Sequence, residues 1–170
     1  MAKEMYPFTP DTARNELLAR SGTALLIGLC LDQQVRTEKA MSGPYELRER
    51  IGHLDARRIA AMRAALLDAA FRRTPALHRY PGMMAKRVKA LCKIIADEYG
   101  NDGARLWKDV GSADELYHRL RSLPGFGEGK AKTGVYILAK FGGLKPKGWQ
   151  NYRCEQDLPW EFEAGKKITR

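Results

Sequence analysis

The stretch Leu123-Pro124-Gly125-Phe126-Gly127-Glu128-Gly129-Lys130 decides the fold. Apolar residues recur on both sides of it at the three-to-four-residue interval of one helix face. Before the stretch these are Leu116, Leu120 and Leu123, and after it they are Val135, Leu138 and Ala139. Proline and glycine end one helix and begin the next. The sequence therefore predicts a glycine-rich hairpin between two helices of an all-α fold.

This hairpin is a predicted anion site. Glycine allows an external group to approach the backbone closely. At the start of a helix the first N–H groups have no partner within the helix. We expect such groups at Gly125, Gly127, Gly129 and Lys130. Because Lys130, Lys132 and Lys140 follow, the expected anion is a phosphate of a polymer. An ordinary helix-to-helix turn is the alternative interpretation.

Net charge points to the same kind of partner. The 170 residues contain 30 lysines and arginines against 20 acidic residues, which gives a formal charge of +10 and a pI of about 9.7. A basic surface favours a polyanion because neutralised phosphates release their counterions. Basic composition also keeps proteins soluble, so charge alone leaves both interpretations open. This length predicts a single domain over residues 1–170, with its core at about 15–142 and a tail at 143–170.

The pattern Leu-Pro-Gly-x-Gly is similar to the helix-hairpin-helix motif of the HhH-GPD superfamily of DNA glycosylases, which includes endonuclease III. Three blocks, Leu31–Val35, His78–Gly82 and Leu123–Gly127, resemble a short bacterial branch of base-excision-repair proteins. The resemblance covers residues 15–142. It implies a two-lobed helical domain with a DNA groove between the lobes. The implied partner is double-stranded DNA that carries a damaged or mispaired base.

Residues 23–35 are apolar all round until Asp32, which predicts a buried helix with a polar end. The resemblance implies that a glutamine after this helix enters DNA and fills the gap left by an extruded base. Gln34 is the closest match, and Gln33 lies beside it. The alternative is that Asp32, Gln33 and Gln34 only cap a helix.

Other helices are predicted around this centre. Thr9-Pro10-Asp11 begins a first helix that ends at Ser21-Gly22. Residues 38–77 are predicted to be mainly helical, with breaks at 42–44, 52–53 and 74–75. A long helix follows Pro81-Gly82 to about Tyr99, and Ser112 with Glu115 forms a capping box before the hairpin.

Basic residues and carbonyls complete the predicted DNA contacts. Lys86 and Arg87 on the long helix, together with Lys130 and Lys132, would add charge along the DNA backbone. The resemblance also implies a monovalent cation held by hairpin carbonyls. The positions for these carbonyls are Arg121, Leu123 and Phe126.

The catalytic pattern departs from the superfamily. Its members cleave the N-glycosidic bond with help from a carboxylate, whose position falls near Lys147 here. The alternative carboxylates are Asp32, which we prefer because a buried helix would hold it and raise its pKa, and Asp157 in the tail. The lysine that forms a Schiff base in bifunctional members aligns with Gly129. Lys130 comes one residue later, about 100° around the helix, so this chemistry is a minority hypothesis.

The tail offers candidates for a base pocket. Trp149 and Tyr152 could stack on an extruded base. The alternative is that these aromatic rings hold the tail against the core.

Cysteine usage argues against a bound cluster. Cys30, Cys92 and Cys154 are far apart and include no C-x-x-C pair, so we expect no iron-sulfur cluster and no other cofactor. No stretch has membrane-spanning length. We expect a soluble, cytoplasmic monomer associated with the nucleoid.

Three functions follow from these observations. The first is a monofunctional DNA glycosylase that flips and removes a damaged or mispaired base by hydrolysis. The second is a non-catalytic lesion-binding protein on a glycosylase fold, which the missing carboxylate favours. The third is a hairpin that serves protein assembly, with incidental basic charge.

Overall fold

The computed structural model describes residues 6–152, 161–163 and 166–168. These residues form nine α-helices, one 3-10 helix and two short strands. In chain order they are α1 (Thr12–Arg20), α2 (Gly22–Leu31), α3 (Thr37–Ile51), α4 (Ala56–Ala61), α5 (Ala64–Arg72), α6 (Pro81–Glu98), α7 (Arg105–Lys108), α8 (Ala113–Arg121), α9 (Glu128–Lys140), η1 (Trp149–Tyr152), β1 (Glu161–Glu163) and β2 (Lys166–Ile168). The predicted all-α class is confirmed, with β1 and β2 added as one antiparallel pair.

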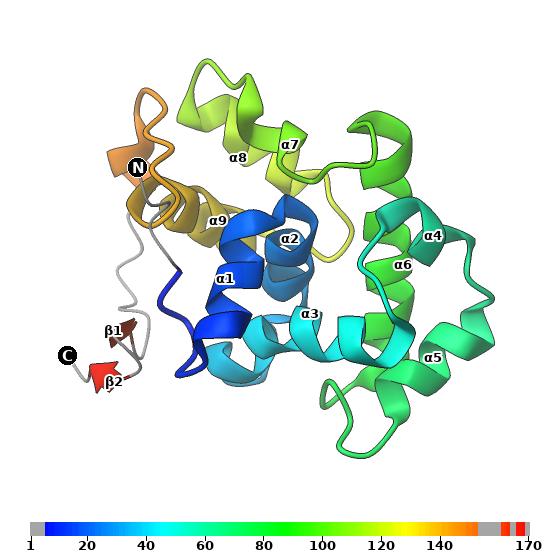
Figure 1. The fold of residues 1–170 in the computed structure, drawn as a ribbon. Coiled ribbons are helices and arrows are strands. Elements are labelled where there is room, and N and C mark those ends of the chain that lie inside the picture. Colours follow the sequence, from blue (N-terminus) through cyan, green and yellow to red (C-terminus); the bar gives the residue numbers. More distant parts are fainter. Residues whose placement is uncertain (1–5, 153–160, 164–165, 169–170) are drawn as a thin grey trace.

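Helix α2 occupies the centre of the fold (Figure 1). It packs against α1, α3 and α6. Helices α4 and α5 cover α6, while α8, α9 and η1 form a second group. Every α2 residue from Thr23 to Leu31 is buried, as the run of apolar residues predicted. The polar residues that follow α2 therefore emerge between the two groups of helices.

Local capping fixes the ends of the first helices. The Asp11 carboxylate accepts hydrogen bonds from the N–H groups of Ala13 and Arg14, so α1 begins at Thr12. Ser21 ends α1 and caps α2 through its hydroxyl, which accepts from Ala24 N–H. The predicted boundary at Ser21-Gly22 is confirmed.

The predicted break at residues 42–44 is wrong, because α3 runs through Gly43 and Pro44 without interruption. Tertiary packing explains the difference. A Cβ on Gly43 would lie 2.4 Å from Leu31 Cδ1, so this glycine lets α3 approach the end of α2. Local propensity is a weak prior that packing of this kind overrides. Pro44 is also buried inside α3.

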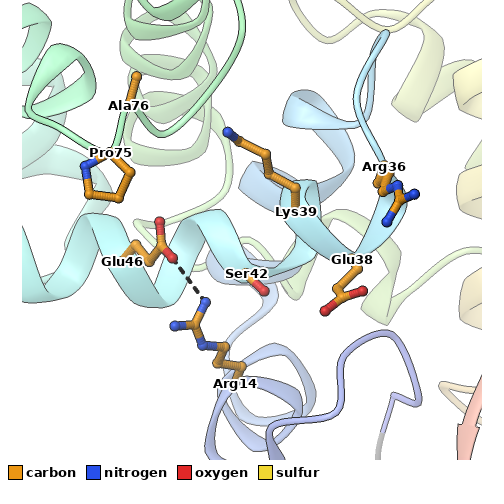
Figure 2. A pocket seen from close by; sticks show the side chains of 8 residues that line it. All are labelled: Arg14, Arg36, Glu38, Lys39, Ser42, Glu46, Pro75 and Ala76. Carbon is orange, nitrogen blue, oxygen red and sulfur yellow. Dashed lines mark hydrogen bonds and ion pairs between the residues drawn. The ribbon is translucent and has the colours of Figure 1, made fainter. Parts of the chain in front are cut away.

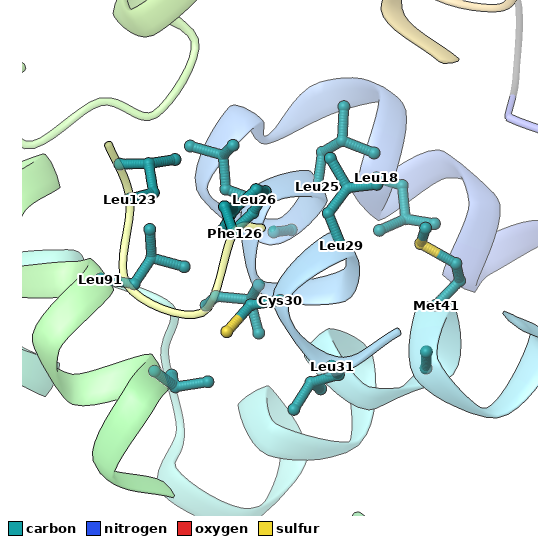
Figure 3. Packing of buried hydrophobic residues seen from close by; sticks show 14 of the residues in the cluster. Leu18, Leu25, Leu26, Leu29, Cys30, Leu31, Met41, Leu91, Leu123 and Phe126 are labelled. Atoms are coloured by element: carbon teal, nitrogen blue, oxygen red, sulfur yellow. The ribbon is translucent and has the colours of Figure 1, made fainter. Parts of the chain in front are cut away.

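The hairpin between α8 and α9 is held by its apolar residues. Leu123 and Phe126 are buried and point toward Leu26 and Cys30 of α2 (Figure 3). Each such side chain contributes about 1.5–3 kcal/mol when it is removed from water. Gly125 has φ +77°, a left-handed conformation that favours glycine. The glycine-rich backbone is therefore fixed at the end of α2.

Candidate functional site

A cavity of about 530 Å³ lies where the hairpin meets the end of α2. Its walls come from the loop after α2, from α6, from the end of α8 and from the hairpin. The lining residues are Gln33, Arg87, Arg121, Leu123, Gly125, Phe126, Gly127 and Lys130. We call this space the hairpin cavity. It brings together residues that the sequence assigned separately to a wedge, a basic helix and a phosphate site.

The first turn of α9 is open at one edge of this cavity. Gly127 is the N-cap residue and has no side chain to cap the helix, so among the described residues the first N–H groups of α9 have no side-chain cap. A Cβ at Gly127 or Gly129 would meet nothing within 4 Å. The exposed N–H groups and the helix dipole together suit an anion.

Helix α8 begins differently. Ser112 Oγ accepts a hydrogen bond from Glu115 N–H at 3.1 Å. The Glu115 carboxylate accepts from Gly111 N–H rather than from Ser112 N–H, at 3.0 Å. The predicted capping box is thus half formed as expected, and its second bond is shifted by one residue. Helix α8 has a side-chain cap where α9 has none.

Lys130 crosses from α9 to the end of α2. Its Nζ donates a hydrogen bond to the Cys30 carbonyl at 2.8 Å and lies 5.6 Å from the centre of the Phe126 ring. Burial lowers the pKa of Lys130, while Cys30 and Asp32 act in the opposite direction. Lys130, one position past the residue that the sequence resemblance aligns with a catalytic lysine, is one of the residues that line the hairpin cavity.

Asp32 lies next to the cavity rather than on its wall. It is the C-cap of α2, and its Oδ1 accepts from Thr37 Oγ1 at 3.5 Å. Burial raises the pKa of Asp32 to about 6, against the opposing effects of Lys130 and Thr37. The carboxyl group is thus within electrostatic reach of the Lys130 amine.

The two candidate wedge residues face different surroundings. Gln33 lines the cavity, and its Oε1 accepts a hydrogen bond from the Arg87 guanidinium. Gln34 is exposed, with φ +55°, and its Oε1 accepts from the Tyr80 hydroxyl at 3.0 Å. Sequence reasoning did not anticipate the contact between Arg87 and Gln33, because no spacing links α6 to the loop after α2.

Two of the predicted DNA-binding lysines lie outside the hairpin cavity. Lys86 lines a groove between α5 and α6. The Lys132 ammonium donates to the exposed Glu128 carboxylate at 2.8 Å. Their predicted roles along a DNA backbone stay predictions.

The hairpin carbonyls do not fit the expected monovalent cation. The Leu123 carbonyl accepts from Phe126 N–H at 3.1 Å. The Phe126 carbonyl accepts from the Arg121 guanidinium at 3.3 Å. A positive side chain therefore already contacts one of the three carbonyls that the resemblance implies for a cation. Arg121 entered the sequence analysis only for its carbonyl, yet its side chain lines the cavity.

The structure does not bring the tail aromatics to the hairpin cavity. The Tyr152 hydroxyl donates to the Asp114 carboxylate of α8, and its ring lies 5.4 Å from that of Tyr117. Trp149 packs against the core from η1. The backbone carbonyl of Lys147, near the position that the sequence resemblance implies for a carboxylate, accepts from Ala113 N–H at 2.9 Å. These contacts favour the interpretation that Trp149 and Tyr152 hold the tail against the core. Asp157 and Cys154 lie outside the described residues.

A second cavity, of about 330 Å³, lies between α1, α3 and the loop before α6 (Figure 2). The Arg14 guanidinium donates to the Glu46 carboxylate across it at 3.0 Å. Arg36, Glu38 and Lys39 add charges of both signs. We call this space the α1–α3 cavity.

Cys30 and Cys92 are buried free thiols. Within residues 6–152 and the two strands, His, Cys, Asp and Glu form no cluster of three that could hold a metal ion. In the same part of the chain, no helix is both long and apolar enough to cross a membrane.

Comparison with known proteins gives one informative likeness. No protein-family model matches the chain. No curated protein matches it either. Among solved structures, the chain is similar to endonuclease III in a trapped covalent intermediate with DNA, described as an estranged-adenine complex, with a TM-score of 0.51 and 20% sequence identity. The match covers 74% of this chain and 50% of that chain, so this chain spans about half the length of its structural neighbour. The protein therefore has the helical fold of endonuclease III over the matched part.

Proposed function

We propose that this protein is a DNA glycosylase that extrudes a damaged or mispaired base and cleaves its N-glycosidic bond at the hairpin cavity. One observation carries the proposal: the uncapped start of α9, the Lys130 amine and Gln33 all border the same space. The likeness to endonuclease III bound to DNA supports it.

DNA binding would use the hairpin and the cations around it. A phosphate at the start of α9 would accept from the free N–H groups of residues 128–130. Arg87 and Arg121 add positive charge on the cavity wall. Such contacts position a duplex without reading its sequence.

Base extrusion would use the loop after α2. A glutamine that enters the stack fills the gap and offers hydrogen bonds to the unpaired partner base. Gln34 is exposed and suits this role, whereas Gln33 turns toward the cavity and Arg87. We assign the wedge to Gln34 and contact with the extruded nucleotide to Gln33.

The chemistry has two routes that this site supports. In hydrolysis, the Asp32 carboxylate stabilises the cationic sugar at C1′ and takes the proton of the attacking water as the base departs. In the covalent route, the neutral Lys130 amine attacks C1′ as the N-glycosidic bond breaks, and one amine proton goes to the departing base. The second amine proton goes to O4′ as the C1′–O4′ bond opens, which leaves a Schiff base between Lys130 and the sugar. Hydrolysis is our lead proposal. The covalent route is the alternative, and it is supported by Lys130, which lines the hairpin cavity.

A non-catalytic lesion-binding protein is the second candidate function. Asp32 does not line the cavity, and Lys147 occupies the position where the superfamily carboxylate is expected. These two observations favour binding without bond cleavage.

Single-turnover incubation with labelled duplexes tests the proposal. The duplexes carry uracil, alkylated purines, oxidised bases or abasic sites, and alkali reveals base loss while borohydride traps a Schiff base. Base release that is lost in Asp32→Asn and leaves no trapped adduct supports hydrolysis. A trapped adduct that is lost in Lys130→Gln supports the covalent route. Tight, salt-sensitive binding without base loss supports the lesion-binding protein instead.

A further inference from the structure

The block His78-Arg79-Tyr80-Pro81-Gly82 has no role in the function proposed above. His78 lies in the loop between α5 and α6 and is 1% exposed. Buried polar side chains are nearly always hydrogen-bonded, so the partners of His78 show what this histidine holds in place.

Those hydrogen bonds reach the loop after α2. His78 Nδ1 accepts from Tyr80 N–H at 2.9 Å, so the ring proton belongs on Nε2. Nε2 then donates to the carbonyls of Leu31 at 3.0 Å and Gln33 at 3.1 Å. One imidazole thus joins the end of α2, the following loop and the start of α6.

Tyr80 makes the second connection. Its hydroxyl donates to Gln34 Oε1 at 3.0 Å. Gln34 has φ +55°, a conformation that a side chain other than glycine, asparagine or aspartate seldom adopts. Such a conformation persists where the surroundings hold it. His78 holds the backbone just before Gln34, and Tyr80 holds the Gln34 side chain.

We propose that His78 and Tyr80 are positioning residues that hold the loop of residues 32–35 so that Gln33 and Gln34 face an incoming duplex. The proposal rests on the proposed function for its DNA step. The hold on the loop itself is a property of the free protein.

Charge around the imidazole predicts how pH acts on this contact. Burial lowers the pKa of His78, and Lys39 from α3 and Lys130 from α9 act in the same direction, while the two carbonyls oppose them. A proton on Nδ1 would remove the bond from Tyr80 N–H. The contact is therefore complete at neutral pH and is lost as the pH falls below the ordinary histidine range.

Nuclear magnetic resonance of the free protein and a base-extrusion assay test the proposal together. The variants are His78→Leu, His78→Gln, which restores a neutral donor, and Tyr80→Phe, which removes only the hydroxyl. His118→Leu, at an exposed histidine on α8, is the matched control. Fluorescence of 2-aminopurine placed in a duplex reports extrusion.

We expect His78→Leu to shift and broaden the backbone signals of Gln33 and Gln34 and to lower the fluorescence gain about tenfold, as loss of buried hydrogen bonds would. Tyr80→Phe should affect Gln34 alone, and His78→Gln should restore most of both readouts. Wild-type signals of Gln33 and Gln34 should broaden in acid.

Unchanged loop signals in both His78→Leu and Tyr80→Phe would overturn the proposal. If His78→Leu does not fold, unchanged Gln34 signals in Tyr80→Phe overturn it instead. A third outcome separates the two proposals. If His78→Leu changes the loop signals but the wild-type protein gives no fluorescence gain with the duplex, the hold on the loop is supported and the glycosylase function is contradicted.

Discussion

Within the part of the chain that the structure describes, charged side chains lie at both the hairpin cavity and the α1–α3 cavity, but they form ion pairs only at the α1–α3 cavity. In the α1–α3 cavity the Arg14 guanidinium meets the Glu46 carboxylate at 3.0 Å and lies 3.5 Å from the Asp11 carboxylate. In the hairpin cavity Lys130 donates to a backbone carbonyl. No ion pair joins Asp32 to a cation among the described residues.

At the α1–α3 cavity, Arg14 and Glu46 are paired with each other and stabilise the structure. Lys130 and Asp32 at the hairpin cavity have no ion-pair partner among the described residues, so they can act on a bound molecule. A charge that is partly removed from water without an ion-pair partner shifts its pKa toward the neutral form. Asp32, with its pKa raised to about 6, and Lys130, with its pKa lowered, both follow this rule. Perturbed groups of this kind gather at functional sites.

The largest effect is expected for Lys130→Gln. In the covalent route, loss of the amine should lower single-turnover base release and borohydride trapping about 10²–10³-fold, as loss of a nucleophilic group does. Lys93→Gln, at an exposed lysine of α6 that pairs with Asp97 at 2.7 Å, should leave both readouts within about twofold. Equal rates for the two variants would remove Lys130 from the chemistry.

Asp32→Asn should stabilise the protein while it impairs catalysis. A folded-state pKa of about 6 against an ordinary 3.8 means that the native state holds the proton more tightly, so stability falls as the pH rises through that window. Asparagine lacks this cost, and we expect a gain of about 1–3 kcal/mol at pH 8 that disappears near pH 4. Urea unfolding at both values measures it.

The control for Asp32→Asn is Asp97→Asn, at a carboxylate that is 58% exposed. It should show no gain in stability at the higher pH. A stability loss in Asp32→Asn at pH 8 would mean that Asp32 is held by attraction rather than strained by burial.

Gly127→Ser should raise the stability of the protein and lower its affinity for DNA. The backbone at Gly127 has φ −76°, and a Cβ would meet nothing within 4 Å, so serine fits and can cap α9. We expect a gain of only about 0.3 kcal/mol in unfolding free energy, because glycine is itself a tolerated N-cap residue. DNA affinity should fall about tenfold, because the capped N–H no longer binds phosphate.

Ser112→Ala is the opposite experiment on α8. It removes an existing cap, so stability should fall by about 1 kcal/mol with DNA affinity unchanged. If both variants changed DNA affinity alike, the difference between the two helix starts would have no functional meaning.

The smallest effect is expected in the α1–α3 cavity. Arg14→Gln breaks a partly exposed ion pair, which should cost about 0.2–1 kcal/mol. DNA binding at moderate salt should stay within about twofold. A larger loss of DNA binding would place the α1–α3 cavity in the interface.

Sequence patterns predicted the elements whose signals are local. The hairpin, the buried helix α2 and the helix boundary at Ser21-Gly22 follow from residue type and spacing. The break at residues 42–44 was wrong because the contact between Gly43 and Leu31 is set by tertiary packing, which no local pattern records.

The candidate site was only partly predictable for the same reason. Lys130 and Gln33 could be named from their motifs, but the sequence did not show that both line one cavity. His78 joins residues that lie 45 and 47 positions away in the chain. Spacing within a helix or a loop cannot reveal contacts of that range.

Chemical-shift mapping with a duplex that carries an abasic-site analogue tests most directly whether the hairpin cavity is the site of DNA recognition. The account predicts the largest shifts at the backbone amides of residues 125–130 and at Gln33 and Gln34, with little change around Arg14 and Glu46. Shifts concentrated on the α1–α3 cavity, or no shifts at all, would contradict it.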